Sequence, residues 1–248
     1  ADLLLAADAP TFEGYAERDL LLEYESPENA RIMQDLIDPE HFYVGTRLLP
    51  TVVAVNTNEI KDPPTSWKDL TDPAYAGKIA MPNPDVSGAA AFNAAVWLNE
   101  PALGLDWLEG LAANQPLIVE SNGPVSQAVA EGSSPVGIVV DSLVRDLAAA
   151  GSPITAVYPE EGVPFVSQPV GIFANTEEPE ASKLLVDFLI GKKGQEVAVS
   201  QSYLPIREDV ASPKGAPKIA DIEFLTPDLQ KIKDSQAQAV ETFNALFQ

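Results

Sequence analysis

Residues 137–146 read Gly137-Ile138-Val139-Val140-Asp141-Ser142-Leu143-Val144-Arg145-Asp146. The first four predict a buried strand, and the apolar spacing that follows Ser142 predicts a helix that closes at Gly151. Asp141 and Ser142 therefore stand at the carboxyl end of a strand, where side chains of an open α/β sheet face a ligand. The alternative is that Asp141 only caps the helix, and the spacing does not decide between the two interpretations.

The same rhythm of strand, turn and helix continues on both sides of this stretch. Short apolar runs predict strands at residues 2–7, 79–81 and 117–119, which indicates an α/β fold of packed layers. Two longer extended segments, Thr51–Val55 and Val166–Ala174, flank the middle of the chain. They predict two crossings between two lobes, with the middle of the chain in one lobe and both ends in the other.

Composition excludes several classes of function. The 248 residues carry a net charge of −22, which repels nucleic acid and anionic lipid, so neither is expected as a partner. There is no cysteine and His41 is the only histidine, which argues against thiol chemistry, a His-based triad and a multi-His zinc site. The chain opens directly on an apolar strand, and we expect it to begin inside a longer protein.

Three predicted helix starts carry small polar residues that suit an anion. They are Thr11 before residues 12–18, Ser87-Gly88 before an alanine-rich helix, and Ser121-Asn122 before residues 125–130. A helix N-terminus carries unpaired N–H donors and a partial positive charge, so several such ends together would hold a phosphate, phosphonate or carboxylate. The alternative for each is ordinary capping.

Three further side chains complete the expected site. Arg47, which follows Thr46, is the candidate for pairing with an anion, because a guanidinium binds oxyanions in a bidentate way. Its alternative is a surface ion pair with one of the many carboxylates. Asp141 would suit an ammonium group or sugar hydroxyls, and Tyr203 either contacts the ligand or packs in the core.

Four motifs carry a resemblance to a known family. They are Ala6-Ala7-Asp8-Ala9-Pro10-Thr11-Phe12, Pro63-Pro64-Thr65-Ser66-Trp67-Lys68-Asp69-Leu70, Gly77-Lys78-Ile79-Ala80-Met81-Pro82-Asn83-Pro84 and Tyr158-Pro159-Glu160-Glu161-Gly162. The chain resembles the extracellular solute-binding proteins of ABC importers, in the ferric-iron-type branch that also includes binders of phosphorylated and phosphonate solutes.

The resemblance implies a two-lobed type II periplasmic-binding fold with a two-strand hinge and a ligand in the cleft between the lobes. The expected lobes are residues 1–55 with 168–248, and residues 56–167. It also implies a monomer outside the cytoplasm, periplasmic or extracellular, that reaches the membrane through an ABC permease. No catalytic residue, metal or cofactor is expected.

One departure bears on the ligand. Iron-binding members of the family resemble one another in two adjacent tyrosines after the strand that matches residues 137–140, where this chain has Asp141 and Ser142. We therefore expect a small anionic or zwitterionic solute, such as a phosphonate or sugar phosphate. The alternatives are an Fe(III) receptor that uses Tyr203, carboxylates and a synergistic anion, and a hydrolase or transferase on a similar fold.

Overall fold

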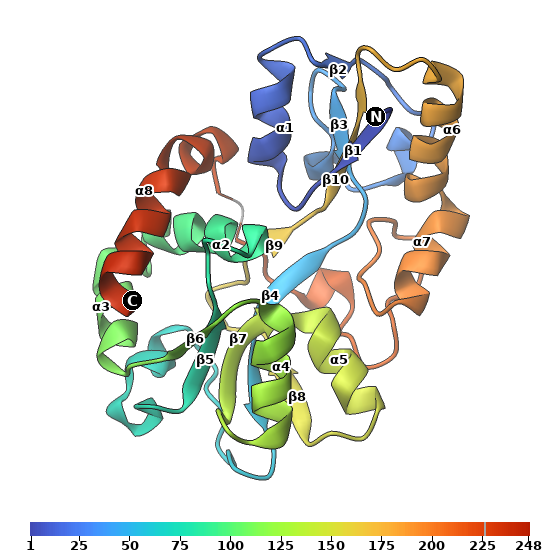
Figure 1. Cartoon of the computed structure of the whole chain (residues 1–248). Helices are drawn as coiled ribbons and strands as arrows, with labels where there is room; N and C mark the ends of the chain where they lie inside the picture. Colours follow the sequence, from blue (N-terminus) through green and yellow to red (C-terminus); the bar gives the residue numbers. More distant parts are fainter. Residues whose placement is uncertain (226) are drawn as a thin grey trace. The chain divides into compact units, whose positions relative to one another are not determined.

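The computed structural model describes residues 1–225 and 227–248, and these form two compact units (Figure 1). Unit 1 comprises residues 1–49 and 166–219, and unit 2 comprises residues 50–165 and 220–248. The chain passes from one unit to the other after Leu49, after Phe165 and after Ile219. Each unit has its own sheet and helices, as expected for an α/β protein.

Unit 1 is built around one central strand. Strand β10 pairs antiparallel with three others, so that the sheet consists of β1 (Leu3–Leu5), β2 (Leu21–Leu22), β3 (Tyr43–Gly45) and β10 (Pro169–Phe173). The helices are α1 (Ala9–Ala16), α6 (Pro179–Ile190) and α7 (Lys192–Ser200), with 3-10 turns at Asn29–Arg31 and Gln34–Leu36. Phe12, Leu21 and Tyr43 form a buried core, and the rings of Phe12 and Tyr43 lie 5.3 Å apart.

Helix α1 begins earlier than the sequence predicts. Its N-cap is Asp8, whose Oδ1 accepts from the backbone N–H of Thr11 at 3.0 Å and from its hydroxyl at 2.7 Å. Pro10 occupies the first turn, where a missing N–H costs nothing. Thr11 is therefore a donor to the cap and not the cap itself, which corrects the expected start of this helix.

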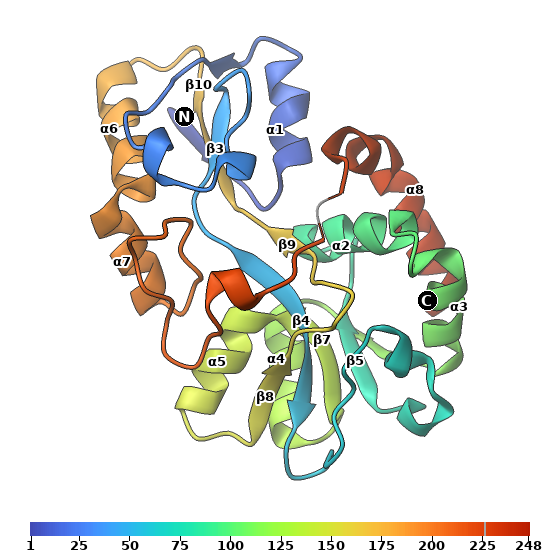
Figure 2. The same ribbon diagram turned by 180° about the vertical axis from the view of Figure 1, so that it is seen from behind.

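Unit 2 contains a mixed sheet of six strands in the order β6-β5-β7-β4-β8, with β9 paired to β4. Figure 2 labels each of these strands except β6. The strands are β4 (Leu49–Asn56), β5 (Ile79–Pro82), β6 (Leu117–Val119), β7 (Val136–Val140), β8 (Ile154–Val157) and β9 (Phe165–Val166). β5 runs parallel to β6 and β7, whereas β4 runs antiparallel to β7 and β8. All five residues of β7 are buried, which confirms the strand predicted from residues 137–140.

The helices of unit 2 follow the strands. They are α2 (Gly88–Asn99), α3 (Gly104–Ala113), α4 (Asn122–Glu131), α5 (Asp141–Ala149) and α8 (Leu229–Phe247), with 3-10 turns at Lys68–Thr71 and Pro73–Tyr75. A further 3-10 turn, Ile219–Asp221, lies where the chain passes from unit 1 to unit 2. Helix α4 packs on β7, and a Cβ at Gly137 would lie 2.6 Å from Val129 Cγ2. The glycine therefore permits the close approach of α4 to the strand. No helix in the described part of the chain has the length and apolar character to span a bilayer.

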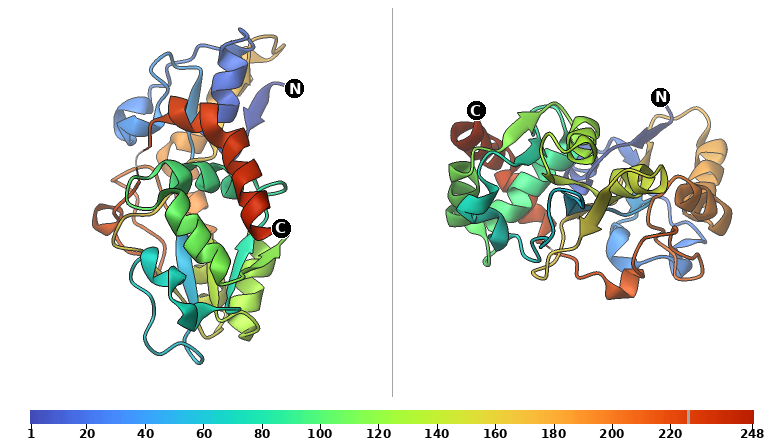
Figure 3. Two further views of the ribbon diagram at one scale, coloured as in Figure 1. Left: turned by 90° about the vertical axis from the view of Figure 1, so that its left-hand side faces the viewer. Right: turned by 90° about the horizontal axis from the view of Figure 1, so that it is seen from below.

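The compact units differ from the expected lobes at residues 220–248, which the sequence grouped with the amino-terminal lobe. Helix α8 explains the difference, because it packs along α2 and α3 within unit 2 (Figure 3). Ile232, Ala239 and Phe243 are buried on one of its faces, and Asn99 Nδ2 donates to Ser235 Oγ at 2.8 Å.

The two expected crossings also take a different form. Residues 51–55 lie within β4 of unit 2, whereas the extended run from Val166 to Ala174 is interrupted at Gln168, which has a φ of 43°. Strand β10, after this interruption, belongs to the sheet of unit 1. The two-strand hinge itself stays a prediction.

Candidate functional site

Asp141 is the first residue of α5, and its carboxylate lies inside unit 2. Asp141 is fully buried, with Oδ2 at 2.5 Å from Arg145 Nη1 and 2.9 Å from the hydroxyl of Tyr158. Val140 is the N-cap residue and no side chain caps this helix, so the capping interpretation of Asp141 does not describe what is seen. The carboxylate instead forms an ion pair with Arg145, which lies one helical turn further along α5.

The electrostatics of this group follow from its burial. Burial raises the pKa of the Asp141 carboxyl, while the hydrogen bonds from Arg145 and Tyr158 act in the opposite direction. Burial, together with the adjacent Asp141 charge, raises the pKa of the Tyr158 phenol, so this hydroxyl remains a donor at neutral pH. Oδ2 of Asp141 accepts hydrogen bonds from Arg145 and Tyr158 within unit 2. A role of Asp141 in contacting the ligand stays a prediction.

Asn122 joins three of the predicted ligand-binding segments. Its Oδ1 accepts from the backbone N–H of Val140 at 3.1 Å, and its Nδ2 donates to Ser87 Oγ at 3.4 Å. The start of α4 is thus tied both to the start of α2 and to the end of β7. Within unit 2 the structure therefore brings together the helix starts that the sequence proposed at Ser87-Gly88 and Ser121-Asn122.

The starts of α2 and α4 differ in whether a side chain caps the N–H groups of the first turn. Ser87 caps α2, since its Oγ accepts from Ala90 N at 3.3 Å. Ser121 makes no side-chain cap on α4, and the N–H groups of Asn122 and Gly123 lie in the first turn, where a helix offers no acceptor. The first turn of α4 is therefore not capped by a side chain. Ser142, the remaining predicted site residue of unit 2, is buried on α5 next to Asp141.

In unit 1 the structure brings Arg47 and Tyr203 together. The guanidinium carbon of Arg47 lies 4.8 Å from the centroid of the Tyr203 ring, and Arg47 Nε lies 3.4 Å from Thr46 Oγ1. Thr46 is buried, and its hydroxyl donates to the Gln168 carbonyl at 2.7 Å. Thr46 is thus fixed within the protein, whereas Arg47 is only half-buried.

Arg47 differs from the two buried arginines in its lack of an ion-pair partner among the described residues. Arg145 pairs with Asp141, and Arg207 pairs with Glu28 and Asp209. Among residues 1–225 and 227–248, no carboxylate lies within ion-pair distance of the Arg47 guanidinium. The alternative of a surface ion pair for Arg47 therefore has no partner among the residues that the structure describes.

Three residues that sequence reasoning missed organise these groups. Arg145 lies one helical turn after Asp141, a spacing that could have indicated the pair. No local sequence pattern pointed to Tyr158 or Gln195, because both form hydrogen bonds with residues that are distant in the sequence.

Thr11, a predicted site residue of unit 1, is exposed at the start of α1, and its backbone N–H and its hydroxyl both donate to Asp8.

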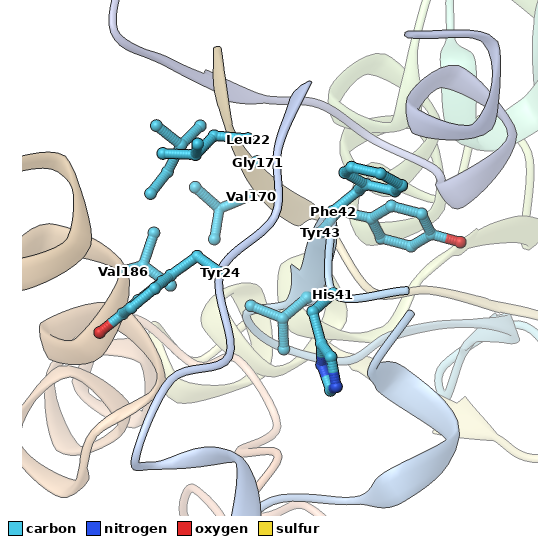
Figure 4. A pocket seen from close by; sticks show the side chains of 10 residues that line it. Leu22, Tyr24, His41, Phe42, Tyr43, Val170, Gly171 and Val186 are labelled. Carbon is cyan, nitrogen blue, oxygen red and sulfur yellow. The ribbon is translucent and has the colours of Figure 1, made fainter. Parts of the chain in front are cut away.

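Unit 1 also contains a small cavity of about 10 Å³ (Figure 4). Its walls are Leu22, Tyr24, His41, Phe42, Tyr43, Val44, Val170, Gly171, Ile172 and Val186. This volume is room for about one water molecule, so the cavity is too small for an organic solute. Within the described residues no three His, Asp or Glu side chains gather closely enough to hold a metal ion, and the expectation that no metal binds stays a prediction.

Comparison with known proteins identifies the family of this chain. The model of the bacterial extracellular solute-binding protein family matches residues 1–234. An uncharacterized protein of Haemophilus influenzae is 29% identical over 202 residues, which cover 75% of this chain and 57% of the relative. The spermidine/putrescine-binding periplasmic protein of Escherichia coli K12 is 27% identical over 201 residues, covering 76% and 56%. The chain thus spans little more than half the length of these curated relatives.

Solved structures share the fold. Iron-bound HitA from Pseudomonas aeruginosa superposes with a TM-score of 0.86 at 20% identity, over 99% of this chain and 82% of that one. AfuA from Actinobacillus pleuropneumoniae, with fructose-6-phosphate bound, gives a TM-score of 0.86 at 24% identity, over 100% and 82%. The expected periplasmic-binding fold is thereby confirmed.

Proposed function

Because this chain belongs to the bacterial extracellular solute-binding protein family, we propose that it captures a small anionic solute for an ABC importer. The solute class is a sugar phosphate, a phosphonate or a similar organic anion. The protein works in the periplasm or outside the cell as a monomer, makes and breaks no bond, and hands the solute to a membrane permease.

Arg47 carries this proposal. In a protein of net charge −22, a half-buried guanidinium that has no carboxylate partner among the described residues is a cation kept available. An intramolecular carboxylate would compete with an incoming oxyanion for the same donors, and no carboxylate in the described part of the chain does so. A phosphate or phosphonate group matches the planar fork of donors that Arg47 presents.

The uncapped start of α4 supports the same solute class. Ser121 leaves the first-turn N–H groups of Asn122 and Gly123 unclaimed by its side chain, and Asn122 holds this turn against Ser87 and Val140. Such donors favour a negative group whatever the net charge of the protein.

Relatives and neighbours of this chain are named for different cargo. The Escherichia coli relative is named for polyamines, which are cations, and HitA was solved with iron. An Fe(III) receptor with a synergistic anion remains the alternative function. In that alternative the Tyr203 phenol would become a metal ligand, and Arg47 would hold the synergistic anion.

Titration calorimetry with inorganic phosphate, fructose 6-phosphate, spermidine and ferric citrate tests the proposal. We expect fructose 6-phosphate to bind and spermidine not to bind. Arg47→Gln should weaken the affinity about tenfold or more, since a charge-assisted hydrogen bond contributes about 1.5–3 kcal/mol. Arg31→Gln, at an exposed arginine of the same unit, is the matched control and should leave the affinity unchanged.

Two outcomes would overturn the anion proposal. One is spermidine binding in the absence of any response to the phosphorylated solutes. The other is a visible charge-transfer band after ferric citrate is added, which would favour the Fe(III) alternative.

A further inference from the structure

The Arg47 side chain lies on the face of an aromatic ring, and no acid among residues 1–225 and 227–248 pairs with it. Its guanidinium carbon lies 4.8 Å above the ring of Tyr203, within the range of a cation–π interaction. A carboxylate at this place would neutralise the guanidinium and occupy its donors. A ring stabilises the cation through its π face. Nε donates to Thr46 Oγ1, so the terminal Nη1 and Nη2 groups, for which the described residues supply no acceptor, are the donors left for an oxyanion.

The backbone on either side of this contact is fixed by hydrogen bonds. The N–H groups of Thr46 and Arg47 both donate to the Ser167 carbonyl, at 2.9 and 3.2 Å. Tyr203 N donates to the Ala198 carbonyl at the end of α7, at 3.1 Å. The backbone at Arg47 is therefore held to residue 167, and the backbone at Tyr203 is held to the end of α7.

One buried side chain connects the two segments. Gln195 is fully buried, with its Nε2 donating to the Thr46 carbonyl at 2.7 Å and its Oε1 accepting from Ile206 N at 2.9 Å. Leu48 N also donates to the Leu204 carbonyl at 3.0 Å. The register between the Arg47 segment and the Tyr203 segment is thus set by bonds on both sides of the cation–π pair.

From this arrangement we propose that Tyr203 is a positioning residue that orients Arg47 for the anion and does not itself contact the solute. This role rests on the proposed function. A free arginine side chain loses rotamer entropy when it is fixed in one geometry. A ring that restrains the guanidinium before the solute arrives removes part of that cost from binding.

The alternative role for Tyr203 is a direct hydrogen bond from its hydroxyl to the solute, and that role requires the hydroxyl. Positioning needs the ring and not the hydroxyl, so Tyr203→Phe should keep the affinity within about twofold of the wild type. Tyr203→Leu removes the ring, and it should weaken binding about three- to tenfold, the range of a cation–π interaction at a partly exposed site.

A second cation–π pair in the same unit supplies the matched control. Arg18 lies 4.9 Å from the ring of Tyr15, near the end of α1. Tyr15→Leu removes a cation–π interaction outside the proposed site together with the ring contact between Tyr15 and Phe173, so it should leave the affinity unchanged. Its loss of melting temperature is an upper reference for the loss in Tyr203→Leu. Similar melting temperatures for the two leucine variants separate a loss of binding from a loss of folding.

The experiment combines calorimetry with NMR of the arginine side chains. Fructose 6-phosphate and inorganic phosphate are titrated into the wild type and the three variants. In parallel, the Nε–H resonance of Arg47 should show a ring-current shift in the wild type and in Tyr203→Phe, and should lose it in Tyr203→Leu. Retained binding in Tyr203→Phe together with weakened binding and a lost shift in Tyr203→Leu supports the positioning role.

Equal loss of affinity in Tyr203→Phe and Tyr203→Leu overturns it in favour of a direct contact. Unchanged affinity in Tyr203→Leu overturns the positioning role alone and leaves the anion function standing. Failure of the wild type to bind either phosphorylated probe overturns the anion function, and the positioning role with it.

Discussion

Asn122 Oδ1 lies 3.1 Å from the backbone nitrogen of Val140, so the first residue of α4 accepts a hydrogen bond from the last residue of β7. The same side chain reaches Ser87 at the N-cap of α2. One amide thereby fixes the relative positions of two helix starts and a strand end, which a set of anion donors requires.

Asn122→Ala should lower the free energy of unfolding by about 1–2 kcal/mol, because it leaves the N–H of Val140 without its acceptor. Urea unfolding followed by tryptophan fluorescence measures this, since Trp67, Trp97 and Trp107 all lie in unit 2. Asn58→Ala, at an exposed asparagine of the same unit, is the control and should have little effect. Equal stabilities of the two variants would contradict the bridging role of Asn122.

Asp141→Ala should destabilise unit 2 by about 3 kcal/mol, because it removes one partner of a buried ion pair between Asp141 and Arg145. Tyr158→Phe removes one neutral donor from the same group and should cost only about 1 kcal/mol. Chemical denaturation at pH 7 ranks the two variants. An Asp141→Ala protein with wild-type stability and lost solute affinity would instead favour the ligand-facing role predicted from the sequence.

Gly137→Ala should lower the free energy of unfolding by about 1–3 kcal/mol through overpacking. The added Cβ would lie 2.6 Å from Val129 Cγ2 and 2.9 Å from Val125 Cγ1, so α4 must shift away from β7. Gly14→Ala in α1 is the contrasting control, since a Cβ there meets nothing within 4 Å. That variant should be stabilised by about 0.5–1 kcal/mol, and thermal melts of both proteins check the pair.

Tyr24 should make stability depend on pH in the alkaline range. Burial, followed by the hydrogen bond to Asp187, raises its pKa from 10.0 to about 12. The unfolded chain releases this proton near pH 10 and the folded chain only near 12. The stabilising contribution is therefore complete below pH 10 and is lost as the pH rises to 12.

Urea unfolding of the wild type and of Tyr24→Phe across this range checks the shift of Tyr24. The difference in unfolding free energy between the two proteins should be constant below pH 9 and should shrink between about pH 10 and pH 12. The other tyrosines are common to both proteins and cancel in the difference. Two curves that remain parallel up to pH 12 would show that the pKa of Tyr24 is not raised.

Local patterns in the sequence were sufficient for the elements and the fold class. The buried strand at residues 137–140 and the helix after it follow from apolar spacing among near neighbours, and so do strands β4 to β6. The start of α1 was misplaced because Thr11 and Asp8 are both good caps, and the spacing could not rank a hydroxyl against a carboxylate three residues before it.

The partners of the site residues could not be read in the same way. Whether Arg47 meets an acid or a ring depends on the segment after α7, and the neighbours of Asp141 include Tyr158, 17 residues further along the chain. The assignment of α8 to unit 2 likewise rests on its packing against α2. The spacing of apolar residues is a property of near neighbours in the sequence, so it predicts strands and helices. The family motifs are likewise short stretches of adjacent residues. Ion pairs, ring contacts and buried amide bridges join distant segments, and they take shape only when the chain packs into its units.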